Sequence, residues 1–266
     1  MHIVEAKKLG ERYMQPTIII DAGHGGFDNG AVYNGRKEKD DTLKLALAVG
    51  KKLENMGFPV VYTRTTDVYQ RPVDKAAIAN NSGGDYFVSI HRNASTNPNM
   101  YSGVQTLVFH DSGVPARMAR AINEELVKLG FQDLGVEERR NLAVLRRTRM
   151  PAVLVEAGFI DSDADNAKFD ENFDEIAAGI ANGIANTVGR EKEAEKRFGV
   201  QVGLFRRYEN AEYLLNQLLA QGYHVQIRDW NHYYAVVVGN ESSLESARQL
   251  EQDLRKKGYD TLIVNI

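Results

Sequence analysis

Largely apolar runs alternate with amphipathic segments along most of this chain. The runs at residues 17–20, 86–90 and 152–155 are rich in branched and aromatic side chains, which is typical of strands buried on both faces of a sheet. Between them, residues 43–53 and 114–129 carry apolar side chains at helical spacing. This alternation predicts an α/β domain with a mostly parallel sheet and helices on both faces.

The polar residues between these segments predict where the helices begin. Asp40 or Asp41 is placed to cap the helix over residues 43–53, and Ser112 is placed to cap the helix over residues 114–129. Further strands are expected at residues 58–62 and 103–109, and further helices at residues 72–81 and 173–188.

The end of the chain contains an internal repeat with an offset of 36 residues. The repeated positions in the first copy are Val200, Val202, Gly203, Ala211, Leu214, Leu218, Gly222, Tyr223 and Ile227. Each copy is expected to form a strand, a helix, a Gly-Tyr turn and a second strand. Two such copies are too few for a solenoid, and they favour a small α+β ferredoxin-like βαββαβ domain with both helices on one face of its sheet.

A charged run, REKEAEKR, lies between the two patterns. Such runs are usually solvated linkers or exposed helix extensions. We therefore expect a first domain over residues 16–189, a charged linker over residues 190–197 and a second domain over residues 198–266.

Composition narrows the classes of partner and of site. The net charge of −3 argues against nucleic acid as a partner, because no basic excess is present to neutralise phosphates. The chain has no cysteine, so a zinc site here would use nitrogen and oxygen ligands. No transmembrane segment is expected, and residues 1–15 lack the apolar core of a signal peptide, so synthesis in the cytosol without a visible export signal is expected.

Candidate chemistry gathers at the ends of the predicted strands. His24 follows the run at residues 17–20, His91 follows the run at residues 86–90, and ligands bind at this edge of open α/β sheets. Either histidine alone is more often a structural residue than a ligand. Glu38 at the start of a helix and Glu156 at the end of another strand favour a metal site over that alternative.

Four sequence blocks resemble the zinc-dependent N-acetylmuramoyl-L-alanine amidases of the amidase type 3 family. The blocks are DAGHGGFDNGAVYNGRKEKD, TRTTD, DYFVSIHRNAS and LAVLRRTRMPAVLVEAGFIDS. The resemblance implies that His24, Glu38 and His91 bind a Zn²⁺ ion and that Glu156 is the catalytic carboxylate. The implied reaction is hydrolysis of the amide between the lactyl group of N-acetylmuramic acid and L-alanine of the peptidoglycan stem peptide.

The chain departs from the pattern of that family at two positions. Lys75 stands where arginine is usual, and Arg92 follows His91 where a small or apolar residue is common. The short segment RNASTNPNMYS after His91 leaves no room for the plug helix of some relatives, so an accessible site is expected. Arg146 is a candidate contact for substrate, although an ion pair of purely structural role is an equally good interpretation.

The C-terminal repeat is similar to the sporulation-related repeat (SPOR) domain, which implies binding to glycan strands stripped of stem peptides. Trp230, Tyr233 and Tyr234 fit a surface that binds a weakly charged sugar polymer. Packing of these aromatic side chains at the edge of the sheet explains them equally well.

Two other functions stay open from the sequence. The chain could be a catalytically silent protein that binds peptidoglycan, or a zinc peptidase that cuts within the stem peptide. The substrate lies outside the membrane and no signal peptide is visible, so release by lysis is expected, either from a mother cell during sporulation or in the manner of a phage lysin. Removal of a leader before this sequence begins would also reconcile the two.

Overall fold

The computed structural model describes residues 15–195, 197–230 and 232–266. The chain divides into two compact units between Val188 and Gly189. The expectation of no signal peptide falls on residues that lie, apart from Gln15, outside the described part of the chain. No helix in the described residues is long and apolar enough to cross a lipid bilayer.

The first unit is built on a six-stranded sheet with the strand order β4-β1-β5-β8-β6-β7. Its strands are β1 (Ile18–Ala22), β4 (Val60–Tyr62), β5 (Tyr86–Asn93), β6 (Val104–Val108), β7 (Asp133–Glu138) and β8 (Ala152–Phe159). Strands β4, β1, β5 and β8 are parallel, and β6 and β7 are parallel to each other but antiparallel to β8. The predicted mostly parallel sheet is confirmed.

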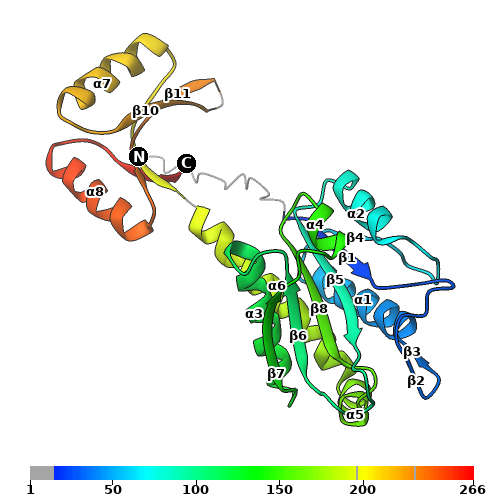
Figure 1. Cartoon of the computed structure of the whole chain (residues 1–266). Coiled ribbons are helices and arrows are strands. Elements are labelled where there is room, and N and C mark those ends of the chain that lie inside the picture. Colours follow the sequence, from blue (N-terminus) through cyan, green and yellow to red (C-terminus); the bar gives the residue numbers. More distant parts are fainter. Residues whose placement is uncertain (1–14, 196, 231) are drawn as a thin grey trace. The chain divides into compact units, whose positions relative to one another are not determined.

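Helices cover both faces of this sheet (Figure 1). They are α1 (Glu38–Asn55), α2 (Pro72–Asn81), α3 (Gly113–Val127), α4 (Ala143–Arg147), α5 (Asp163–Glu171) and α6 (Phe173–Glu195). Ile18 and Ile20 of β1 pack in one apolar cluster with α1, α3 and α6, while Ile19 packs on the other face with α2 and α4. Successive side chains of a strand point to opposite faces, so a continuous run of isoleucines fills both layers.

Helix α1 begins earlier than its candidate capping residues. Asp40 and Asp41 lie within its first turn, and Lys37 at the N-cap makes no side-chain capping bond. The amides of Glu38 and Lys39 instead donate to the carbonyl oxygens of Ala31 and Asn29, at 2.9 and 3.1 Å. These loop carbonyls satisfy the free amides of the first turn and make a capping side chain unnecessary.

Other boundaries also differ from the expected ones. Ser112 is the N-cap residue of α3, as predicted, but its side chain makes no capping bond. Strand β7 and the short helices α4 and α5 were not among the predicted elements. Residues 190–195 of the charged run are helical and continue α6. This part of the run is therefore a helix extension rather than an extended linker.

The second unit has the predicted βαββαβ order. Its elements are β9 (Phe198–Phe205), α7 (Tyr208–Ala220), β10 (Val225–Trp230), β11 (Tyr233–Glu241), α8 (Leu244–Lys256) and β12 (Leu262–Asn265). The strands form an antiparallel sheet with the order β10-β11-β9-β12. Equivalent residues of the two repeats, such as Leu218 and Leu254, are fully buried in one apolar cluster. The positions that repeat in the sequence therefore include those that form the core.

Candidate metal centre

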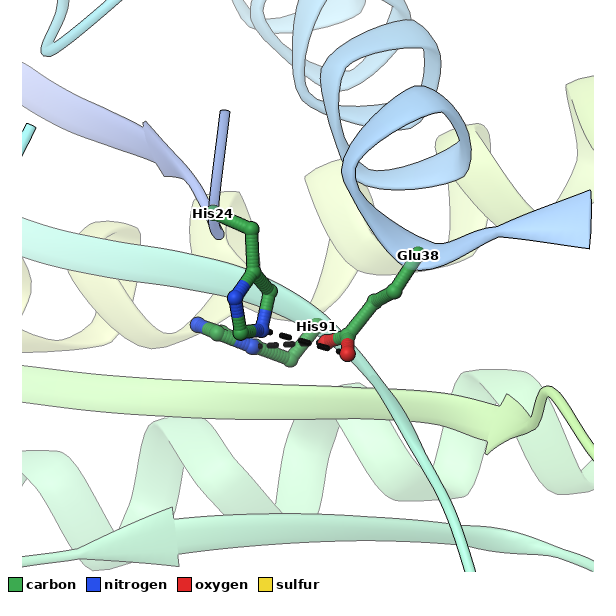
Figure 2. Close-up of side chains that lie close together, drawn as sticks. All are labelled: His24, Glu38 and His91. Carbon is green, nitrogen blue, oxygen red and sulfur yellow. Dashed lines mark hydrogen bonds and ion pairs between the residues drawn. The ribbon is translucent and has the colours of Figure 1, made fainter. Parts of the chain in front are cut away.

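Three predicted ligands converge at one edge of the first unit's sheet (Figure 2). His24 lies two residues beyond β1, His91 lies in β5, and Glu38 is the first residue of α1. Strands β1 and β5 are parallel neighbours, so the histidines that follow the two apolar runs reach the same edge. Strand β5 continues to Asn93, so His91 is within the strand rather than beyond it.

The Glu38 carboxylate lies between the two imidazole rings. Its Oε1 is 2.8 Å from His91 Nδ1, and its Oε2 is 3.1 Å from His24 Nε2. One candidate ligand atom from each residue lies within 4.8 Å of the others. The three side chains therefore present two nitrogens and one carboxylate to a common point.

Glycines allow this close approach. A Cβ atom at Gly23 would clash with the His91 ring, and a Cβ atom at Gly30 would clash with both the Glu38 carboxylate and the His24 ring. His24 itself has a φ of 58°, in the left-handed region that a non-glycine residue rarely adopts. The backbone here is shaped around the three side chains.

Asp28 orients the His24 ring. Its Oδ2 lies 2.9 Å from His24 Nδ1, and its Oδ1 accepts a hydrogen bond from the amide of Gly30 at 3.0 Å. This carboxylate fixes Nδ1 and leaves Nε2 facing Glu38, which is the arrangement of a metal-ligating histidine with a carboxylate behind it. Asp28 was not among the predicted site residues, although its place four residues after His24 in HGGFD is a usable signal.

Arg64 ties together the segments that carry His24 and Glu38. Its buried guanidinium donates to the carbonyl oxygens of Ala22, Gly23 and Lys39, at 3.0, 2.7 and 3.0 Å. These carbonyls lie immediately before His24 and immediately after Glu38. The role of Arg64 was also missed, and its only signal is its place in the block TRTTD.

The local field favours positive charge. Burial raises the pKa of Glu38, but the two imidazoles lower it by more, so this pKa lies well below its usual range. Burial lowers the pKa of His24, while Glu38 and Asp28 raise it to about 9. The pKa of His91 is also raised, because the Glu38 carboxylate outweighs burial. Carboxylates that stabilise extra protons on imidazoles stabilise a divalent cation in the same place.

This donor set fits Zn²⁺. Two imidazoles and one glutamate are a ligand set of catalytic zinc, in which the fourth position is left for water or substrate. The donors are nitrogen and oxygen only, as the absence of cysteine requires. The Asp28 contact supplies the outer partner that such histidines usually have.

Glu156 lies beside the cluster on the neighbouring strand. It is the register partner of His91 across β5 and β8, and β8 continues beyond it to Phe159. Its Oε2 atom is buried and has no hydrogen-bond partner among the described residues. Burial raises the pKa of Glu156 to about 7, although His91 opposes this. A carboxylate with this pKa can both accept and donate a proton near neutral pH.

The two departures from the family pattern have partners of their own. The Lys75 ammonium is buried 2.7 Å from Asp21 Oδ1 and also donates to the carbonyl of Ala22. The Arg92 guanidinium lies 2.8 Å from Asp41 Oδ2 and 4.1 Å from the centre of the Phe169 ring. Both side chains are therefore buried and paired within the first unit.

Arg146 is exposed near the end of α4. Its amide donates to the carbonyl of Leu142 at 2.9 Å, and no contact among the described residues joins its side chain to the three-residue cluster. Its part in substrate binding stays a prediction.

Comparisons with known proteins agree on one kind of enzyme. The family model for N-acetylmuramoyl-L-alanine amidase matches residues 18–186, and the SPOR domain model matches residues 194–265. The chain is 37% identical over 212 residues to N-acetylmuramoyl-L-alanine amidase CwlM of Bacillus licheniformis. The aligned region covers 77% of this chain and 82% of that protein. It is 34% identical over 213 residues to the sporulation-specific N-acetylmuramoyl-L-alanine amidase of Bacillus subtilis (strain 168), with the same two coverages.

A solved structure shares the fold of the first unit. The crystal structure of N-acetylmuramoyl-L-alanine amidase from Clostridium difficile 630 superposes with a TM-score of 0.63 at 34% sequence identity. The match covers 66% of this chain and 98% of the other.

Proposed function

The chain belongs to the N-acetylmuramoyl-L-alanine amidase family and acts on peptidoglycan, and we propose that it does so with a zinc ion held by His24, Glu38 and His91. The observation that carries this proposal is the Glu38 carboxylate seated between two imidazoles, one of them backed by Asp28. The bond cleaved is the amide between the lactyl group of N-acetylmuramic acid and L-alanine.

Glu156 is the proposed general base and acid. Zinc bound by such a set lowers the pKa of a water molecule to about 7 and polarises a carbonyl group. As the oxygen of the water molecule attacks the carbonyl carbon, Glu156 accepts the proton that the water loses. It then donates this proton to the alanine nitrogen as the C–N bond breaks. A pKa near 7 suits both steps, because neither protonation state is strongly preferred.

The second unit is the proposed targeting domain. We propose an amidase domain over residues 16–189, a linker over residues 190–197 and a SPOR domain over residues 198–266.

The sheet of the second unit leaves exposed aromatic side chains for a ligand. Helices α7 and α8 pack on one face of this sheet, and Trp230 is 53% exposed. Trp230 pairs across the strands with Tyr233, whose ring lies 5.7 Å from the Arg206 guanidinium. Tyr234 instead packs in the apolar cluster and against Tyr208. We assign Trp230 and Tyr233 to a surface for denuded glycan, and Tyr234 to the core.

The site of action is the cell wall, reached after lysis of the producing cell. The sporulation-specific relative in Bacillus subtilis supports release from a mother cell. The phage-type route predicts the same chemistry, so this choice does not affect the proposed mechanism.

Digestion of purified sacculi tests the proposal. The protein is incubated with sacculi with and without a chelator, and with zinc added back, and the products are identified by mass spectrometry. The proposal requires new L-alanine amino termini and an equal number of newly freed lactyl carboxylates. Both products should be lost with chelator and restored by zinc. Cleavage within the stem peptide would make the enzyme a peptidase, and binding without cleavage would make it a silent wall-binding protein.

A further inference from the structure

An exposed aromatic pair stands on the loops beside the candidate metal centre. Phe27 is 79% exposed, and Tyr69, in the loop between β4 and α2, is 40% exposed. Their ring centroids are 4.0 Å apart and the rings are tilted by 34°. Two aromatic rings that stack on each other and still face solvent form an apolar surface that the fold of the core does not need.

The turn that carries Phe27 is held firmly. The backbones of Gly25 and Asp28 exchange two hydrogen bonds, at 3.0 and 3.2 Å. The amide of Gly26 donates to Asp67 at 2.7 Å, and its carbonyl accepts from the Lys39 ammonium at 2.8 Å. Lys39 and Asp67 are themselves paired at 2.7 Å, so the peptide on either side of Gly26 is fixed.

The second ring is brought close by the backbone of the same turn. Gly26 has a φ of 60°, and a Cβ atom there would clash with the backbone and Cβ of Tyr69. Both features require glycine. The turn and the Tyr69 loop therefore meet in a single arrangement, in which the two rings form a preformed platform.

The platform lies within reach of the reacting centre. Three peptide bonds separate Phe27 from His24, which limits the distance between their Cα atoms to about 11 Å. The residue after Phe27 is Asp28, which contacts the His24 ring directly. The turn is therefore close enough to contact a substrate whose carbonyl lies at the three-residue cluster.

We infer that Phe27 and Tyr69 bind the face of a sugar ring of the substrate's glycan strand. The inference rests on the proposed function and specifies which part of the substrate this edge of the site recognises. The cleaved amide is joined to muramic acid by a short lactyl ether, so a bound substrate places a pyranose ring close to the reacting carbonyl. Pyranose rings present an uncharged face of C–H groups, which matches an exposed aromatic surface.

Substitutions at Phe27 test whether sugar binding needs an aromatic ring or only an apolar side chain of similar size. Phe27→Leu keeps apolar volume and removes the ring, and Phe27→Trp keeps a ring. Two substrates are compared: a disaccharide carrying a stem peptide, and a lactyl peptide that has the same amide and no sugar. On the disaccharide substrate, Phe27→Leu is expected to raise KM by roughly three- to tenfold at little cost in kcat, and Phe27→Trp to keep the parental KM. On the lactyl peptide, kcat/KM should be the same for all three proteins.

Met56→Ala is the matched control. Met56 is also apolar and exposed, at 40%, but lies at the opposite end of the helix that begins with Glu38. It should change neither kinetics nor thermal stability. An equal loss for Phe27→Leu on both substrates, a loss explained by a lower Tm, or no change on the disaccharide substrate would each overturn the inference. If the parental enzyme cleaves neither substrate, the proposed function itself fails.

Discussion

The two units of the chain bury very different side chains. Among the described residues of the first unit, eight charged side chains are buried: Asp21, Glu38, Lys39, Arg64, Lys75, Arg92, Asp161 and Asp165. Within the described residues of the second unit, no charged or polar side chain is buried, and the core consists of apolar side chains repeated in two copies. Burying a charge costs free energy unless it is paired and hydrogen-bonded.

The difference fits the roles that we propose for the two units. In the first unit, buried charges hold backbone segments and other side chains in place, as Arg64 holds the segments that carry His24 and Glu38. A reaction site needs such fixed groups. The second unit has an apolar core, which is sufficient to support the glycan-binding surface that we propose.

The largest expected effect comes from Glu156→Gln, which tests whether the chemistry belongs to the first unit alone. The amide cannot accept a proton, so we expect kcat on sacculi to fall by about 10²- to 10⁴-fold. Bound zinc and binding to denuded glycan should stay at the parental level. Turnover by this variant at the parental rate would contradict the assignment of the general base.

Lys75→Met tests the buried charges of the first unit. It leaves Asp21 buried without its cation, and we expect a loss of about 3–5 kcal/mol in the free energy of unfolding, measured by chemical denaturation. Lys51→Met is the control, because Lys51 is exposed and its pair with Glu54 is worth at most about 1 kcal/mol. Equal effects of the two substitutions would show that the buried pair has no special part in stability.

The repeat of the second unit predicts matched effects in its two copies. Leu218→Ala and Leu254→Ala each remove a fully buried side chain at equivalent positions. Each should lower the free energy of unfolding by about 2–5 kcal/mol. Leu219→Ala, at an exposed neighbouring position, should have little effect. If one buried leucine behaves like the exposed control in thermal unfolding, the two copies do not share the core equally.

Acid should weaken the first unit through Asp21. Burial raises the pKa of Asp21, but Lys75 and hydrogen bonds from Ser89 and Thr63 lower it by more, so the folded pKa lies below the unfolded value of about 3.9. This carboxylate therefore contributes stability above about pH 4, and the contribution is lost as the pH falls through the folded pKa.

A paired neutral variant isolates that contribution. Asp21→Asn combined with Lys75→Met removes both charges, so its free energy of unfolding should fall less steeply below pH 4, by up to about 1.4 kcal/mol per pH unit. Identical pH slopes for the parent and the double variant would show that Asp21 has no linked proton.

The sequence was sufficient for the features that depend on local pattern. Apolar runs predicted buried strands, and parallel strands predicted that His24 and His91 share an edge. The 36-residue offset predicted the second core. Features with no signal in the hydrophobic pattern were missed. Glu38 begins α1 as expected, but the capping of its first turn by the carbonyls of Asn29 and Ala31 was not predicted. Strand β7, with the sequence DLGVEE, has too few apolar side chains to reveal a strand.

Zinc binding tests the central claim most directly. Protein stripped with a chelator is titrated with zinc, and crystals of the loaded protein are measured at the zinc absorption edge. We expect one ion per chain, bonded to His24, Glu38 and His91 at about 2.0–2.2 Å, and loss of that ion in Glu38→Ala. An ion bound elsewhere, or no ion at stoichiometric zinc, would contradict the account.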